Sequence, residues 1–145
     1  MNFFEEYKYI IIPILTVLSA QLIKFLIEVT RNKTISVERL LNGNGGMPSS
    51  HTAFTTSLTT CVGIGVGFNS PLFAACTIFT IIVAYDSMGL RMESGKQAVA
   101  INKLMKKNNI KCDEKLKEML GHKPLEVLAG IIFGILFATF LMNIL

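Results

Sequence analysis

Long uninterrupted runs of apolar residues constrain this chain more than any other feature. Hydrophobic residues make up 51% of its 145 positions. They occur in long runs, not in a stripe that repeats about every 3.6 residues as on a soluble helix. A helix needs about 20 mostly apolar residues to cross the hydrocarbon core of a membrane. We therefore predict an all-α integral membrane bundle that forms one domain over residues 1–145.

Four apolar segments predict four transmembrane helices. They run from about Tyr9 to Val29, His51 to Phe68, Pro71 to Tyr85 and Leu125 to Leu145. The second and third are short for a core of about 30 Å at about 1.5 Å per residue, so we expect them to extend into flanking residues or to be partly surrounded by protein. Apolar residues at helical spacing also predict an amphipathic cytoplasmic helix within residues 88–110, on the membrane surface.

The basic residues predict the orientation of the bundle. Of the 14 lysines and arginines, all except Lys8 and Lys24 lie in the segments 30–50 and 87–124. If four spans alternate, these two segments share one side of the membrane, and the uncharged turn at residues 69–71 lies on the other. Cation-rich loops are typical of the cytoplasmic side. We therefore predict a multi-pass protein of the cell membrane with both termini outside.

In this topology the unusual polar residues gather at the cytoplasmic ends of the spans. They are Lys24 and Arg31 on the first span, Ser49, Ser50 and His51 at the start of the second, Asp86 and Arg91 after the third, and His122 and Glu126 at the start of the fourth. Free N–H groups at a helix start, together with Lys and Arg, suit a phosphate group. Of two histidines, one can attack phosphorus while the other protonates the leaving oxygen.

The order and spacing of these residues resemble a known superfamily, that of type 2 phosphatidic acid phosphatases and vanadium haloperoxidases. Its three motifs are Lys-x6-Arg-Pro, Pro-Ser-Gly-His and Ser-Arg-x5-His-x3-Asp. This chain reads Lys24-x6-Arg31 followed by Asn32, then Pro48-Ser49-Ser50-His51, then His122-x3-Glu126 followed by VLAG. Lys115 and Leu116 stand where the Ser-Arg pair is expected. The resemblance covers residues 21–130 and is closest to a small divergent bacterial membrane branch, in which Arg91 of the YDSMGLR segment would supply the missing cation.

The resemblance implies a role for each residue that matches a motif. His122 would be the nucleophile that forms a phosphohistidine, Glu126 would orient its ring, and His51 would be the general acid. The phosphoryl oxygens would be bound by Lys24, Arg31, Ser49 and Arg91, with Ser50 as a further donor or as a source of crowding, and Asp86 would support the site. The resemblance implies no metal and no other cofactor.

Structural interpretations of the same residues stay open. Ser49 or Ser50 would serve as an N-cap without any catalytic part. His51 would be an interfacial histidine, and Lys24 would pair with Glu28 on the same helix and reach the water.

Three further interpretations concern the later segments. Asp86 and Arg91 would brace a loop, and His122 and Glu126 would form a polar pair at a helix entrance. Gly130 and Gly134 are typical of close helix packing, either within the chain or in a homodimer.

Three functions compete at this stage. The first is a membrane phosphatase acting on a lipid phosphate or diphosphate. The second is a catalytically silent relative that binds a phosphorylated lipid or acts as a structural or regulatory membrane protein. The third, a small transporter or channel component, has less support, because the polar residues gather at one end of the spans. The expected partners are a phosphorylated lipid and membrane lipids, with no nucleic acid.

Overall fold

The computed structural model describes residues 3–32, 46–110, 115–118 and 120–145, without the side chains of residues 3, 28, 31 and 32. These ranges contain five helices and no strand. The helices are α1 (Phe3–Asn32), α3 (Ser50–Val66), α4 (Pro71–Met88), α5 (Leu90–Lys107) and α6 (Pro124–Ile144). The predicted all-α class is confirmed.

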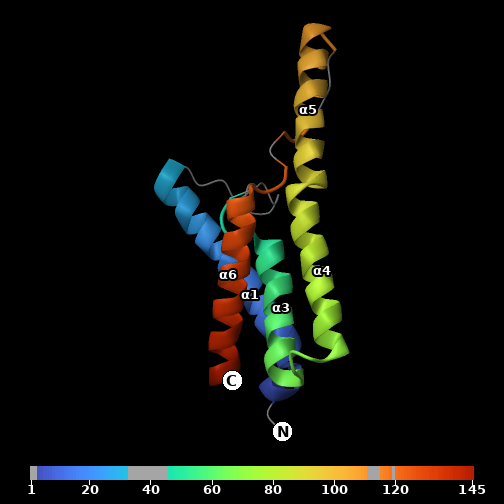
Figure 1. The fold of residues 1–145 in the computed structure, drawn as a ribbon. Coiled ribbons are helices and arrows are strands. Elements are labelled where there is room, and N and C mark those ends of the chain that lie inside the picture. The colour runs from blue at the N-terminus through green and yellow to red at the C-terminus, as the bar shows by residue number, and fades with distance from the viewer. Residues whose placement is uncertain (1–2, 33–45, 111–114, 119) are drawn as a thin grey trace.

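The bundle is built around α3, which packs against α1, α4 and α6. Figure 1 shows both chain termini at one end of the bundle and the starts of α3 and α6 at the other. The chain therefore passes along the bundle four times in alternating directions, as the four apolar segments predict. The turn between α3 and α4 lies at the end that holds the termini (Figure 1).

Three helical segments are long and apolar enough to cross a membrane by themselves. Within the described part of the chain these are Phe4–Ile27, Pro71–Lys107 and Pro124–Ile144. Helix α3 has only 17 residues, which gives a length of about 25 Å and is short for a hydrocarbon core of about 30 Å. Its central position compensates for this, because the surrounding helices cover much of its surface.

Small and hydroxyl-bearing residues explain why α3 occupies the centre. Its buried side chains include Thr52, Ala53 and Ser57, and most other helices leave large apolar side chains exposed instead. In α3 the hydroxyl of Thr60 donates to the carbonyl of Thr56 one turn earlier, at 2.9 Å. Such bonds satisfy hydroxyl groups inside the helix that carries them, so α3 can be buried despite its polar sequence.

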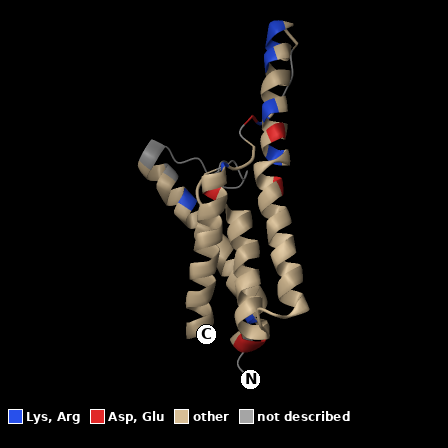
Figure 2. Ribbon diagram, in the orientation of Figure 1, with Lys and Arg blue, Asp and Glu red and all other residues tan. Residues whose placement is uncertain are grey.

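Helix α5 continues the line of α4 and projects beyond the end of the bundle (Figure 1). The sequence predicts this helix but favours a position across the membrane surface. Gly89 ends α4 and precedes α5. Figure 2 shows Lys and Arg spread along α5, whereas α3, α4 and α6 carry almost no charge along their length.

Two glycines let α6 approach α3 closely. A Cβ atom on Gly130 would lie 2.6 Å from the carbonyl oxygen of Ser49, and one on Gly134 would lie 2.7 Å from that of Ala53. Ala138 continues this face into a small core with Ile12 and Cys61. The glycine face that the sequence assigns to helix packing or to a homodimer is thus occupied within one chain.

Candidate functional site

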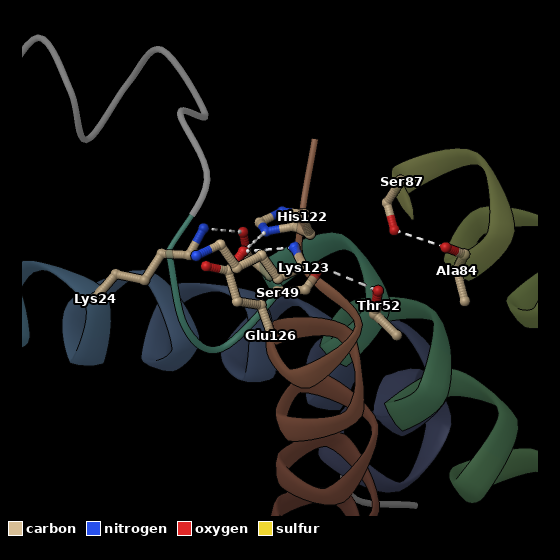
Figure 3. A network of polar contacts seen from close by, with 9 residues as sticks. Lys24, Ser49, Thr52, Ala84, Ser87, His122, Lys123 and Glu126 are labelled. Atoms are coloured by element: carbon tan, nitrogen blue, oxygen red, sulfur yellow. Dashed lines mark hydrogen bonds and ion pairs between the residues drawn. The ribbon is translucent and has the colours of Figure 1, made fainter. Parts of the chain in front are cut away.

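The predicted site residues with described side chains lie at the end of the bundle opposite the termini. There α3 and α6 begin, α4 meets α5, and the second half of α1 passes alongside. Figure 3 shows Lys24, Ser49, His122 and Glu126 together at the start of α3 and α6. Three segments that are distant in sequence, the second half of α1 and the starts of α3 and α6, therefore contribute to one region.

His122 and Glu126 form the central contact of this region. The Nδ1 atom of His122 lies 3.0 Å from Oε2 of Glu126, and the imidazole is almost fully buried at 4% exposure. His122 precedes the first residue of α6, yet the contact forms across the helix start. An ionised carboxylate only accepts hydrogen bonds, so this pairing favours the tautomer with the proton on Nδ1. Nε2 then keeps a free lone pair.

The backbone of His122 is fixed by α4, a contact that the sequence does not reveal. Its N–H donates to the carbonyl of Ser87 at 2.9 Å. Carbonyls in the last turn of a helix lack partners within that helix, and His122 supplies one. Gly121 approaches so closely that a Cβ there would lie 2.6 Å from the backbone nitrogen of Met92, and its φ is +85°. A glycine just before a histidine is the only sequence signal of this arrangement.

Lys24 reaches from α1 to the start of α3. Its Nζ lies 3.4 Å from the hydroxyl oxygen of Ser50, and the lysine is half-buried. This contact crosses between helices, whereas the alternative interpretation pairs Lys24 with Glu28. The side chain of Glu28 lies outside the described residues, and so does that of Arg31. The predicted phosphate contact of Arg31 therefore stays a prediction.

Ser49 occupies the N-cap position of α3 but does not cap the helix with its side chain. Its hydroxyl pairs with that of Thr52 at 3.0 Å, and the residue is fully buried. Its backbone N–H donates to the carbonyl of Glu126 at 2.9 Å. The side chain of Ser49 therefore does not cap the first backbone N–H groups of α3. Uncapped N–H groups at a helix start suit an anion. Thr52 is a neighbour that the motifs do not contain.

His51 and Arg91 lie on the exposed side of the region. The Nε atom of Arg91 donates to Oδ2 of Asp86 at 3.0 Å, so the predicted brace between these two residues is present. His51 directly follows Ser50, whose hydroxyl oxygen lies 3.4 Å from Nζ of Lys24, so His51 lies at the same start of α3.

The environment of His122 favours its neutral form. Burial lowers the pKa of its imidazole below the ordinary value, and the positive charges of Lys24 and Arg91 lower the pKa further. The hydrogen bond and the negative charge of Glu126 oppose this shift. A neutral imidazole with a free Nε2 is the form that acts as a nucleophile.

The described residues contain no group of three His, Cys, Asp or Glu side chains placed to hold a metal ion. Among the described residues, the charged groups of this region are the cations Lys24, Arg91 and Lys123 and the anions Asp86 and Glu126. Asp86 accepts from Arg91, while Glu126 contacts His122 and also accepts from the backbone N–H of Lys123. The cation of Lys24 contacts only a hydroxyl among the bonds described, so it is the group best placed to meet an incoming anion.

Comparison with known proteins places these residues in a wider context. A sequence model described as "Divergent PAP2 family" matches residues 6–137, most of the chain. The chain is also 39% identical over 134 residues to "Uncharacterized membrane protein YuiD" of Bacillus subtilis (strain 168), with 83% of this chain and 84% of that protein covered. No solved structure matches.

Proposed function

The chain belongs to the divergent PAP2 family, and from this premise we propose that it is a membrane phosphatase that hydrolyses a lipid phosphate or diphosphate through a phosphohistidine. The observation that carries the proposal is the contact between His122 Nδ1 and Glu126 Oε2, made by a buried imidazole beside Lys24. A carboxylate that fixes the tautomer of a histidine prepares its other nitrogen for attack. A lone polar pair at a helix entrance would not need the cation or the second histidine.

In the first chemical step, Nε2 of His122 attacks the phosphorus atom of the substrate. A P–N bond forms, the P–O bond to the lipid breaks, and His51 donates its proton to the departing oxygen. Glu126 stabilises the positive charge that develops on the ring of His122. The products of this step are a lipid with a free hydroxyl, or a lipid monophosphate from a diphosphate, and a phosphohistidine.

In the second step, water releases the phosphate. His51, now neutral, takes a proton from a water molecule, and the water oxygen attacks phosphorus. The P–N bond breaks and His122 returns to its neutral form, so the protein regains its starting protonation state. One water molecule is consumed for each phosphate released, and the step needs no electron transfer or co-reactant.

The transferring phosphoryl group would meet positive charge and N–H donors. Lys24 lies beside Ser50 at the start of α3, where backbone amides point away from the helix. Arg91 is bound to Asp86 through Nε, which leaves its two terminal nitrogens for phosphate oxygens. Groups fixed in advance around a developing charge stabilise the transition state without reorganisation. We place this site at the cytoplasmic face of the membrane, since the cation-rich helix α5 extends from this end of the bundle (Figure 2).

The test is the release of inorganic phosphate by the purified full-length protein in detergent. A panel of lipid monophosphates and diphosphates should be compared with a water-soluble phosphate monoester. We expect release from at least one lipid, inhibition by vanadate, which imitates five-coordinate phosphorus, and no effect of EDTA. Loss of activity with EDTA that a divalent metal restores would contradict the mechanism.

The second candidate is a catalytically silent relative that binds phosphorylated lipid. It is favoured by the ion pair between Asp86 and Arg91, because this engages the cation that would replace the missing arginine of the third motif. Binding of a lipid phosphate without any phosphate release, in the same preparation, would decide for this alternative.

A further inference from the structure

The start of α3 and the start of α6 meet at a single glycine. We propose that Gly130 is a positioning residue, whose missing side chain sets how closely the segment carrying His51 approaches the His122–Glu126 pair. The predicted effect on turnover rests on the proposed function. The predicted displacement of the start of α3 does not depend on turnover and can be tested separately.

The contact at Gly130 involves backbone and not a movable side chain. A Cβ on Gly130 would lie 2.6 Å from the carbonyl oxygen of Ser49, 3.2 Å from its Cβ and 3.3 Å from its nitrogen. Rotation of the Ser49 side chain cannot relieve the shortest of these distances. A methyl group at position 130 therefore displaces the segment that begins α3.

The displaced segment is tied directly to the catalytic pair. The N–H of Ser49 donates to the carbonyl oxygen of Glu126 at 2.9 Å, while Oε2 of the same glutamate binds His122 at 3.0 Å. One residue thus connects the start of α3 to the proposed nucleophile. When Ser49 moves away from Gly130, this backbone hydrogen bond lengthens first.

The same displacement also moves the proposed site residues that follow Ser49 in the chain. Ser50, which contacts Lys24, and His51, the proposed acid, directly follow Ser49. In-line transfer requires the attacking and the protonating groups on opposite sides of one phosphorus, at fixed separation. A shift of about 1 Å in such a geometry reduces turnover by about 100-fold.

Gly134 offers a matched control on the same two helices. It lies one turn further along α6, and a Cβ there would lie 2.7 Å from the carbonyl oxygen of Ala53 and 3.0 Å from Cβ of Thr56. The added methyl group and the steric conflict are nearly the same as at Gly130. The difference is that Ser49 bonds directly to Glu126, whereas Ala53 is linked to it only through the helical hydrogen bond of its N–H to the carbonyl of Ser49.

The experiment compares Gly130→Ala with Gly134→Ala in purified protein, with turnover expressed per folded molecule. We expect kcat to fall by about 100-fold in Gly130→Ala, and to stay within about three-fold of wild type in Gly134→Ala. KM should change less than kcat in Gly130→Ala, because Lys24 on α1 and the lipid-facing surface are not part of the displaced segment, and little in Gly134→Ala. Equal losses in the two variants would overturn the proposal.

A second measurement needs no activity. The N–H of Ser49 donates to the carbonyl oxygen of Glu126 at 2.9 Å, so hydrogen exchange of the Ser49 amide, followed by NMR, reports whether the starts of α3 and α6 stay in contact. Exchange of this amide should become faster in Gly130→Ala and stay as in wild type in Gly134→Ala. If wild type releases no phosphate, the proposed function fails, but this measurement still decides the positioning role. Exchange that is unchanged in both variants would refute it.

A third variant serves if Gly130→Ala does not fold. Thr52→Val removes the hydroxyl that holds Ser49 at 3.0 Å and adds no bulk. We expect a loss of turnover of about 10-fold, with the equivalent change at Thr56 as the control, because Thr56 lies one turn away and does not contact Ser49 in a described hydrogen bond. Unchanged turnover in Thr52→Val would count against the positioning role.

Discussion

Polar side chains form different kinds of contact at the two ends of the bundle, and a lysine of α1 gives an example at each end. Near the termini Lys8 contacts Glu5 at 3.5 Å, three residues earlier on the same helix. At the other end Lys24 contacts Ser50, which is 26 residues away on another helix. Local pairs on one helix contribute little and occur wherever a helix meets water. Contacts that bring distant segments together are what distinguishes a candidate site from a solvated helix end.

The largest expected effect at the site end follows from removal of the proposed nucleophile. His122→Ala should reduce phosphate release by about 10⁴-fold or more, because no other described side chain is placed to form the covalent intermediate. The measurement is phosphate release together with trapping of a phosphorylated protein by quench into alkaline denaturant, because a phosphohistidine is stable in base and hydrolyses in acid. A variant that keeps full activity would assign the nucleophile elsewhere.

The effect of Glu126 is expected to be smaller and to depend on pH. Glu126→Gln removes the carboxylate that orients His122, and we expect kcat to fall by about 10³-fold with little change in substrate binding. Glu126 raises the pKa of His122, so its loss lowers that pKa further. Attack requires neutral His122, and the acid limb of the rate profile should therefore move to lower pH.

The control for this pH effect is Lys24→Ala. Lys24 lowers the pKa of His122, so its removal should move the acid limb to higher pH, opposite to the shift in Glu126→Gln. Shifts in the same direction in the two variants would contradict the assignment of this limb to His122.

Lys24 also allows the two ends of the bundle to be compared directly. Lys24→Ala should reduce kcat/KM by about 100-fold, since it removes a cation from the proposed phosphate site. Lys8→Ala, a change of the same residue type on the same helix, should leave kcat/KM within about two-fold of wild type. Comparable losses in the two variants would mean that α1 acts through stability or membrane insertion and not through the site.

Side-chain identity explains which parts of this site could be predicted from the sequence. The spacing of His122 and Glu126 predicts their contact, and long apolar runs predict the helices. The interhelical contact of Lys24 was not predictable from its spacing to Glu28, since the two alternatives differ only in tertiary packing.

Most features of the site that could not be predicted from the sequence are contacts between backbone groups. The carbonyl of Ser87 that fixes His122 and the carbonyl of Glu126 that binds Ser49 carry no signal in residue type. Only their glycine neighbours, Gly121 and Gly130, hint that backbones approach there. The direction of α5 was likewise hidden, because its amphipathic pattern is the same whether it lies across the bundle end or continues α4.

The smallest expected effect lies in α3, one turn from the site, and concerns stability. The hydroxyl of Thr56 is buried and has no hydrogen-bond partner among the described residues. Burial of an unpaired hydroxyl costs about 1 kcal/mol or more, so Thr56→Val, which keeps the shape, should raise the free energy of unfolding by about 1 kcal/mol.

Thr52→Val makes the opposite prediction on the same helix, because it leaves the buried hydroxyl of Ser49 without this partner. We expect it to lower the free energy of unfolding by about 1 kcal/mol. Thermal unfolding of both variants in one detergent, followed by circular dichroism, would compare their Tm values with that of wild type. A Tm for Thr56→Val below that for Thr52→Val would show that Thr56 has a partner inside the bundle. The site would then reach further along α3 than its first turn.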